Sequence, residues 1–218
     1  MLTKIKQSKS EKILLIFLIS LAIFAFSSFV LIKNKCLFVE NVKIDKLVFT
    51  NRENIVVMNI NCGNVIIELL PEVSPNAVAR FKNMIANKEY DDVAFHRVVE
   101  NFLVQAGDLE FGKKGNINYT YIGSGKSKYR LIKPEKDKPF DFEKGSVGFA
   151  KSKNGDMEDS EFFILLSDAP LFEGEYTPLG NVTHGFAALT KIKSGNKSEY
   201  VLRPDFINSL RTLPEISN

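Results

Sequence analysis

The sequence VAFHRVVENFLVQAGD, from Val93 to Asp108, contains the pattern that decides the fold. Two apolar runs rich in β-branched and aromatic residues flank a polar turn at Glu100–Asn101, which is typical of two strands in a barrel or sandwich. Arg97 is a permanent cation between bulky apolar neighbours, and an isolated buried charge is costly. Arg97 is therefore either a surface residue on an edge strand or a residue with a specific role.

The chain on both sides of this stretch also reads as short strands joined by turns. Ile55–Ile60 and Val65–Leu70 form a predicted hairpin, because Gly63 in the connection tolerates positive φ. Ser74 and Pro75 are the expected N-cap and first residue of an amphipathic helix that ends near Asn87. Later strands are predicted at 145–150, 161–166, 200–202 and 205–210, with a short helix at 185–192. These elements predict a mainly β fold, an antiparallel barrel capped by helices.

The segment Ile13–Ile32 is a run of apolar and small residues without charge. As a helix it spans roughly 30 Å, which matches the hydrocarbon core of a bilayer. Lysines before the run outnumber those after it, so the N-terminus is expected in the cytoplasm. A cleaved signal peptide is the alternative, since Ala25–Ser27 is a passable cleavage site. The apolar run continues past Ser27, which favours an uncleaved single-pass anchor in the inner or plasma membrane, with the folded domain periplasmic or extracellular.

The predicted organisation has five parts. Residues 1–12 are a basic cytoplasmic tail, 13–32 the transmembrane helix, 33–54 a stalk or an added edge strand, 55–212 the folded domain and 213–218 a C-terminal tail. The first part contains four lysines and Glu11, which account for the whole net charge of +3, so the rest of the chain is neutral. A neutral domain argues against nucleic acid as a partner. Cys36 and Cys62 either pair outside the cytoplasm or remain free thiols.

A long loop is predicted from Gly112 to Pro139. It contains eight basic residues against Glu135 and Asp137, which favours either contact with anionic lipid headgroups or an acidic client, or a solvated loop. Gly125-Lys126-Ser127 resembles the end of a phosphate-binding loop. Thr120 occupies the place of its first glycine and no strand leads into it, so a nucleotide site is not expected.

Several ordered blocks resemble the cyclophilin-type peptidyl-prolyl isomerases. The blocks are Phe95–Val99, Phe102, Gln105–Asp108, Gly145–Ala150, Ser160–Ile164, Leu171–Gly174 and Pro178–Val182. The similarity extends from about Ile55 to Leu210. It implies a closed eight-stranded antiparallel barrel capped by two helices, with a proline-binding site on the outer face. It also implies proline-containing polypeptides as substrates and no metal or other cofactor.

The resemblance also implies a role for individual residues. Arg97 matches the catalytic arginine of the family, and Gln105 matches a residue that binds the peptide backbone. The other positions that match the substrate site are Phe102, Leu103, Ala150, Lys151, Glu161, Phe163, Leu171 and Tyr176. For Phe102 and Phe163, ordinary core packing is the alternative, since most phenylalanines are buried for that reason.

The chain departs from the family pattern at four of these positions. Glu161 replaces a glutamine, Lys151 an asparagine, Leu171 an aromatic residue and Tyr176 a histidine. Two functions are therefore expected. The first is a membrane-anchored prolyl isomerase that assists folding of exported or membrane proteins. The second is a weakly active or inactive cyclophilin-like module that binds proline-containing segments.

Overall fold

The structure, a computed structural model, describes residues 8–33, 35–151, 157–195 and 200–216. Its chain divides into two compact units, Met1–Phe38 and Val39–Asn218. The first unit contains helix α1 (Lys9–Lys33), in which Lys9–Leu31 is long and apolar enough to cross a membrane. Both cysteines, Cys36 and Cys62, are disulfide-bonded, so the alternative of free thiols is wrong.

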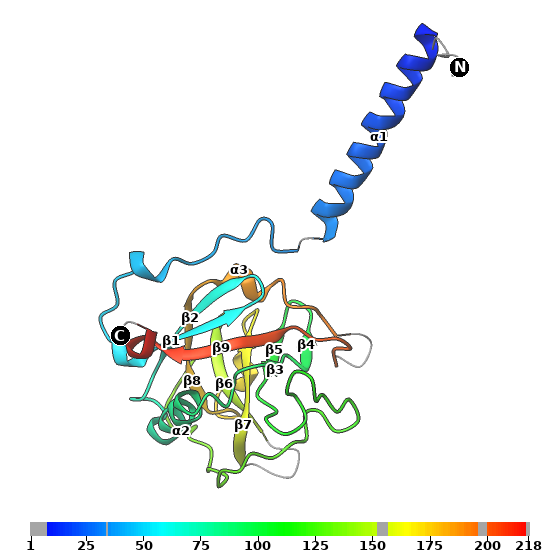
Figure 1. Cartoon of the computed structure of the whole chain (residues 1–218). Coiled ribbons are helices and arrows are strands. Elements are labelled where there is room, and N and C mark those ends of the chain that lie inside the picture. The colour runs from blue at the N-terminus through cyan, green and yellow to red at the C-terminus, as the bar shows by residue number, and fades with distance from the viewer. Residues whose placement is uncertain (1–7, 34, 152–156, 196–199, 217–218) are drawn as a thin grey trace. The chain divides into compact units, whose positions relative to one another are not determined.

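The second unit is built around one curled antiparallel sheet (Figure 1). The predicted hairpin is confirmed by its first two strands, which pair from Ile55 opposite Glu68 to Ile60 opposite Gly63. The nine strands are β1 (Ile55–Ile60), β2 (Gly63–Leu69), β3 (Val93–Ala94), β4 (Arg97–Val99), β5 (Leu103–Ala106), β6 (Ser146–Lys151), β7 (Glu158–Leu165), β8 (Pro178–His184) and β9 (Phe206–Thr212).

The sheet is not a closed eight-stranded barrel, so that expectation was wrong. Its strand order is β3-β9-β1-β2-β8-β6-β7-β5-β4. The two edge strands, β3 and β4, are consecutive pieces of one extended segment and are separated by Phe95 and His96 alone. Two consecutive strands can pair with each other only if the chain turns back between them, and no turn separates β3 from β4. The chain itself, rather than a ladder of hydrogen bonds, therefore joins the two edges.

Three helices belong to this unit among the described residues, instead of the expected two: α2 (Pro75–Ala86), α3 (Phe186–Leu189) and α4 (Leu213–Ile216). The apolar face of α2 is buried as its spacing predicts, through Ala77, Val78, Phe81, Met84 and Ile85. The expected cap is different. The Ser74 hydroxyl donates to the carbonyl of Pro178, and the Glu135 carboxylate accepts the N–H of Ala77 at 2.8 Å. A carboxylate at a helix N-terminus is favourable, and here the long loop supplies it.

Residues 39–54, which precede β1 in the second unit, form neither a strand nor a free stalk. Two 3₁₀ turns, η1 (Ile44–Lys46) and η2 (Arg52–Asn54), interrupt this segment. Its apolar side chains Val42, Ile44, Leu47 and Phe49 pack on the outer-face cluster Ile55, Val57, Ile66 and Leu213. This segment is therefore packed on the folded unit.

The expected C-terminal tail begins with a packed residue, because Leu213 is the first residue of α4 and is buried. Residues 217–218 lie outside the described part.

The predicted loop at 112–139 contains no named helix or strand, yet it is held at several points. Asp108, two residues after the end of β5, accepts four backbone N–H groups, from Glu110, Phe111, Gly123 and Gly125. A side chain at Gly125 would lie 2.1 Å from the Asp108 carboxylate, so this close approach requires glycine. Further along, Asp159 accepts the N–H of Ser127 at 2.8 Å. The loop is thus anchored to the sheet by buried carboxylates.

Candidate functional site

A row of residues in register crosses one end of the sheet. Arg97 of β4 lies opposite Gln105 of β5, Gln105 lies opposite Phe163 of β7, and Phe163 lies opposite Gly148 of β6. Residues directly opposite each other in antiparallel strands project to the same face. The register therefore brings a cation, an amide and an aromatic ring together on the outer face, although they are far apart in sequence.

The neighbouring residues Phe162 and Phe163 explain how two consecutive phenylalanines are both buried. Phe162 points to the inner face, where its ring lies 5.2 Å from that of Phe81 and 5.3 Å from that of Tyr90. Phe163 points outward, and its ring lies 5.4 Å from that of Phe172 and 5.2 Å from that of Tyr176. The alternation of a strand thus assigns Phe162 to the core and Phe163 to the candidate site.

Hydrogen bonds link the polar members of the row. Arg97 Nη1 donates to Gln105 Oε1 at 3.3 Å, and Gln105 Nε2 donates to Glu161 Oε2 at 2.7 Å. His96 Nε2 lies 3.4 Å from the same Glu161 oxygen, and the His96 side chain is buried. Its ring also stacks on Tyr200, with centroids 6.5 Å apart. Glu161 therefore contacts Gln105 and His96 on the face that carries Arg97.

An aromatic cluster forms the apolar part of the site. Its buried members are Leu103, Phe142, Ala150, Phe163, Leu165 and Ala169, and half-buried members pack against them: Val99, Phe102, Phe140, Phe172 and Tyr176. The Phe102 and Phe172 rings meet edge to face at 5.8 Å. Five of the predicted substrate residues, Phe102, Leu103, Ala150, Phe163 and Tyr176, therefore lie in one cluster.

Leu171 does not join this cluster, because its side chain is 87% exposed. Its neighbour Phe172 takes the place instead, 4.5 Å from the Tyr176 ring and 5.4 Å from the Phe163 ring. Both residues lie in the 3₁₀ turn η3 (Pro170–Phe172), where successive side chains point about 120° apart. When Phe172 faces the cluster, Leu171 has to face solvent.

Lys151 lies at the edge of the cluster. Its Nζ lies 2.9 Å from a carboxylate oxygen of Glu175 and 5.1 Å from the centre of the Tyr176 ring. A cation over an aromatic face is attracted by the ring quadrupole. The charge of Lys151 is thus held beside the apolar surface by residues of the segment after η3.

Several residues of the site were not predicted from the sequence. Phe172 and Phe142 complete the cluster, and His96 lies beside Glu161. Gly148 makes room for the Phe163 ring, because a Cβ at this position would lie 2.7 Å from Phe163 Cζ. The pair of phenylalanines at 162–163 was the available signal for a two-faced strand. No sequence pattern distinguishes Phe172 from Leu171.

The arrangement places a permanent cation beside a half-buried apolar surface. Such a surface suits a ring-shaped apolar group, and the guanidinium can donate a hydrogen bond to an atom next to that ring. Within the described residues, no group of three or more His, Cys, Asp or Glu side chains is placed to hold a metal ion.

Comparisons with known proteins identify relatives of this chain. A family model described as cyclophilin type peptidyl-prolyl cis-trans isomerase/CLD matches residues 55–212. A probable peptidyl-prolyl cis-trans isomerase of Brucella suis is 39% identical over 159 residues, which are 71% of this chain and 80% of the relative. A crystal structure of a cyclophilin type isomerase of Cryptosporidium parvum, in the presence of the dipeptide Ala-Pro, is 25% identical with a TM-score of 0.62 and covers 72% of this chain and 98% of that one. A cyclophilin of Hirschia baltica shares the fold with a TM-score of 0.61, at 18% identity and 74% coverage of both chains.

Proposed function

The chain belongs to the cyclophilin-type peptidyl-prolyl cis-trans isomerase family and is an enzyme of that class, and we propose that Arg97 catalyses the rotation of prolyl bonds in exported or membrane proteins. The observation that carries this proposal is the register of Arg97, Gln105 and Phe163 on one face, next to the aromatic cluster. The presence of Ala-Pro with the Cryptosporidium relative supports proline-containing peptides as substrates.

The reaction needs selective stabilisation of a twisted amide. Resonance imposes a barrier of about 18–20 kcal/mol on rotation of the peptide bond, so an X-Pro bond interconverts over tens to hundreds of seconds. Twisting localises the lone pair on the prolyl nitrogen. A guanidinium that donates to this nitrogen only in the twisted state lowers the barrier, because it binds the transition state more strongly than the ground state.

The remaining residues have supporting roles in this proposal. The aromatic cluster holds the proline ring through Phe102, Leu103, Phe163 and Phe172 while the acyl side rotates. Gln105 positions the guanidinium of Arg97 and binds the substrate backbone. Lys151, Ala150 and Tyr176 lie where the substrate chain leaves the proline ring. The reaction requires neither a nucleophile nor a metal.

We also propose that α1 anchors the protein in the inner or plasma membrane. Its uncharged core is long enough to span the bilayer, and the lysines before it favour a cytoplasmic N-terminus. The catalytic unit is then periplasmic or extracellular. In that position it meets polypeptides as they leave the membrane, before their prolyl bonds have reached the native isomers.

A second function is favoured by one observation. Gln105 donates to Glu161 and accepts from Arg97, so both ends of its amide make a hydrogen bond within the protein. The Glu161 contact holds this amide in one orientation, and a substrate that requires another orientation has to break it, which lowers turnover. The alternative is thus a cyclophilin-like module that holds proline-containing segments with little catalysis.

One experiment separates the two functions. The full chain, reconstituted in lipid nanodiscs, is mixed with a neutral proline-containing tetrapeptide, and the relaxation from cis to trans is followed after a solvent jump. We expect the relaxation rate to rise in proportion to the enzyme concentration. Peptide binding without any acceleration above the uncatalysed rate would establish the binding module instead.

A further inference from the structure

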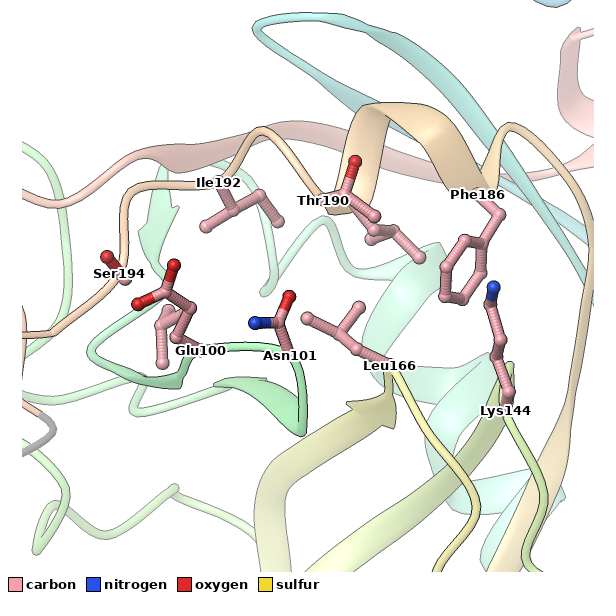
Figure 2. Close-up of a pocket in the computed structure, with 10 residues that line it drawn as sticks. Glu100, Asn101, Lys144, Leu166, Phe186, Thr190, Ile192 and Ser194 are labelled. Atoms are coloured by element: carbon pink, nitrogen blue, oxygen red, sulfur yellow. The ribbon is translucent and has the colours of Figure 1, made fainter.

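A pocket of about 240 Å³ lies in the second unit, outside the aromatic cluster (Figure 2). The turn between β4 and β5, the ends of β4 and β7, the turn before β6 and the segment 186–194 form its walls. Its lining residues are Val98, Glu100, Asn101, Lys144, Leu166, Phe186, Leu189, Thr190, Ile192 and Ser194. None of them belongs to the aromatic cluster. The pocket is therefore separate from the proposed proline site.

Five of the ten lining residues are apolar (Val98, Leu166, Phe186, Leu189 and Ile192), and the pocket has oppositely charged ends. Figure 2 shows Glu100 and Ser194 at one end and Lys144 with Phe186 at the other, with Asn101 and Leu166 between the two ends. The Lys144 Nζ lies 4.5 Å from the centre of the Phe186 ring. Within the described part of the chain, the side chains of Glu100 and Lys144 form no hydrogen bond or ion pair. Both charges are thus available to a ligand.

The size of the pocket limits what it can hold. Sites for drug-sized ligands and cofactors usually occupy about 300–1,000 Å³. A pocket of about 240 Å³ is smaller than this range, and it suits one apolar side chain with part of its backbone. Polar groups at both ends of an apolar site fix the orientation of a ligand, so the complementary ligand carries charges of opposite sign on either side of an apolar group.

We propose that this pocket is a second binding site for client polypeptide. It takes one apolar side chain, with an acidic residue of the client next to Lys144 and a basic residue next to Glu100. The inference rests on the proposed function in one respect, that the ligands of this protein are polypeptides. It assigns to the client a sequence preference that does not involve proline.

The two sites share one turn. Asn101 lines the pocket, and the next residue, Phe102, belongs to the aromatic cluster. The Phe102 carbonyl accepts the N–H of Leu166, which also lines the pocket, at 2.7 Å. One client chain can therefore occupy both sites, and the second contact then forms at high effective concentration. The pocket would retain a client while its prolyl bond isomerises in the other site.

The test uses the full chain in nanodiscs and fluorescent tripeptides without proline. The probes are Asp-Leu-Lys and Lys-Leu-Asp with blocked ends, since the chain direction of the client is open, and the reference peptides replace Leu by Ser. We expect one Leu peptide to bind about tenfold more tightly than its Ser counterpart, because its side chain leaves water. Lys144→Glu should weaken that peptide about fivefold through charge reversal. The matched control Lys133→Glu changes an exposed lysine elsewhere and should leave binding unchanged.

The outcomes separate this site from the proposed function. Equal affinities of Leu and Ser peptides, or equal effects of Lys144→Glu and Lys133→Glu, would overturn the second site. Both variants should retain the kcat/KM of wild type on a proline tetrapeptide, because neither lysine lies in the proposed catalytic site. Tripeptide binding without isomerase activity in the same preparation would overturn the proposed function and leave the second site standing.

Discussion

Gln105 Nε2 donates a 2.7 Å hydrogen bond to Glu161 Oε2, and this contact turns the amide oxygen of Gln105 toward the guanidinium of Arg97, 3.3 Å away. An ionised carboxylate only accepts hydrogen bonds, so Glu161 fixes which end of the amide faces the arginine. The same carboxylate adds a negative charge to the face on which Arg97 is proposed to act. Glu161 therefore has two opposite effects on catalysis, since it orders Gln105 and it weakens the field of the cation.

Replacing Glu161 by glutamine decides which effect is larger. We expect Glu161→Gln to raise kcat/KM severalfold, since about 1 kcal/mol changes a rate about fivefold. The gain follows from removal of a negative charge that opposes donation by Arg97. The measurement is kcat/KM on a neutral tetrapeptide, with Glu173→Gln as a control for the loss of an exposed carboxylate. Equal values would mean that Glu161 does not restrain Arg97, and a loss would mean that ordering of Gln105 is the larger effect.

Arg97→Ala should reduce kcat/KM by at least about tenfold, or about 1.4 kcal/mol, with little change in Tm. The proposed donor to the prolyl nitrogen is then absent, while the fold loses one half-buried side chain. Arg97→Lys should also be a poor enzyme, because an ammonium lacks the planar fork of the guanidinium. If Arg97→Ala lowers Tm strongly and its folded fraction keeps full activity, the residue has a structural role.

The neighbouring residues Leu171 and Phe172 form a matched pair for testing the proline pocket. Phe172→Ala should lower kcat/KM about tenfold and destabilise the domain by about 2 kcal/mol, because it opens a cavity between the Phe102 and Phe163 rings. Leu171→Ala should change the free energy of unfolding by less than about 0.5 kcal/mol, since its side chain is exposed. If Leu171→Ala lowers kcat/KM more than Phe172→Ala does, Leu171 belongs to the substrate site.

Glu158, at the start of β7, makes stability depend on pH. Its side chain is fully buried, and this burial raises the pKa of Glu158 to about 7. The unfolded chain ionises this group near its ordinary pKa of 4.5. Between these two values the unfolded state binds fewer protons than the folded state, so the free energy of unfolding falls as the pH rises.

The variant Glu158→Gln should remove this dependence. At pH 8 it should be more stable than wild type by up to about 3 kcal/mol, and at pH 4 the two should be similar. Tm measured by near-ultraviolet circular dichroism from pH 4 to 8 gives the comparison. If the Tm values of wild type and variant change in parallel across this pH range, Glu158 ionises in the folded protein without a cost in stability.

The proposed membrane topology has a direct biochemical test. The full chain should stay in the membrane fraction through high salt and alkaline wash, because the uncharged run Ile13–Ile32 is long enough to span the bilayer. Protease added to the outer face should digest the chain from Lys33 onward, and protease on the cytoplasmic side should not. Recovery of a soluble chain that begins near Ser28 would show that the apolar helix is a cleaved signal peptide.

Local patterns in the sequence were sufficient to predict most of the helices and strands. The hairpin of β1 and β2 and the buried face of α2 follow from periodicity over a few residues, and the structure has them where they were expected. The expected N-cap was less accurate, because Glu135 reaches α2 from a distant loop. The expected strand at 161–166 instead begins at Glu158, where a buried acid gives no apolar signal.

The sequence by itself determined the family, the apolar helix at the N-terminus and the strands that carry Arg97, Gln105 and Phe163. These properties depend on composition and on side-chain alternation along single segments. The tertiary structure decided that Phe172 and not Leu171 joins the aromatic cluster, that Glu161 contacts Gln105 and His96, and that Asp108 anchors the long loop. Each of these contacts joins different strands, turns or loops. Which neighbour a side chain meets there depends on the register of the sheet and on the packing of its outer face, and neither is encoded in a local pattern.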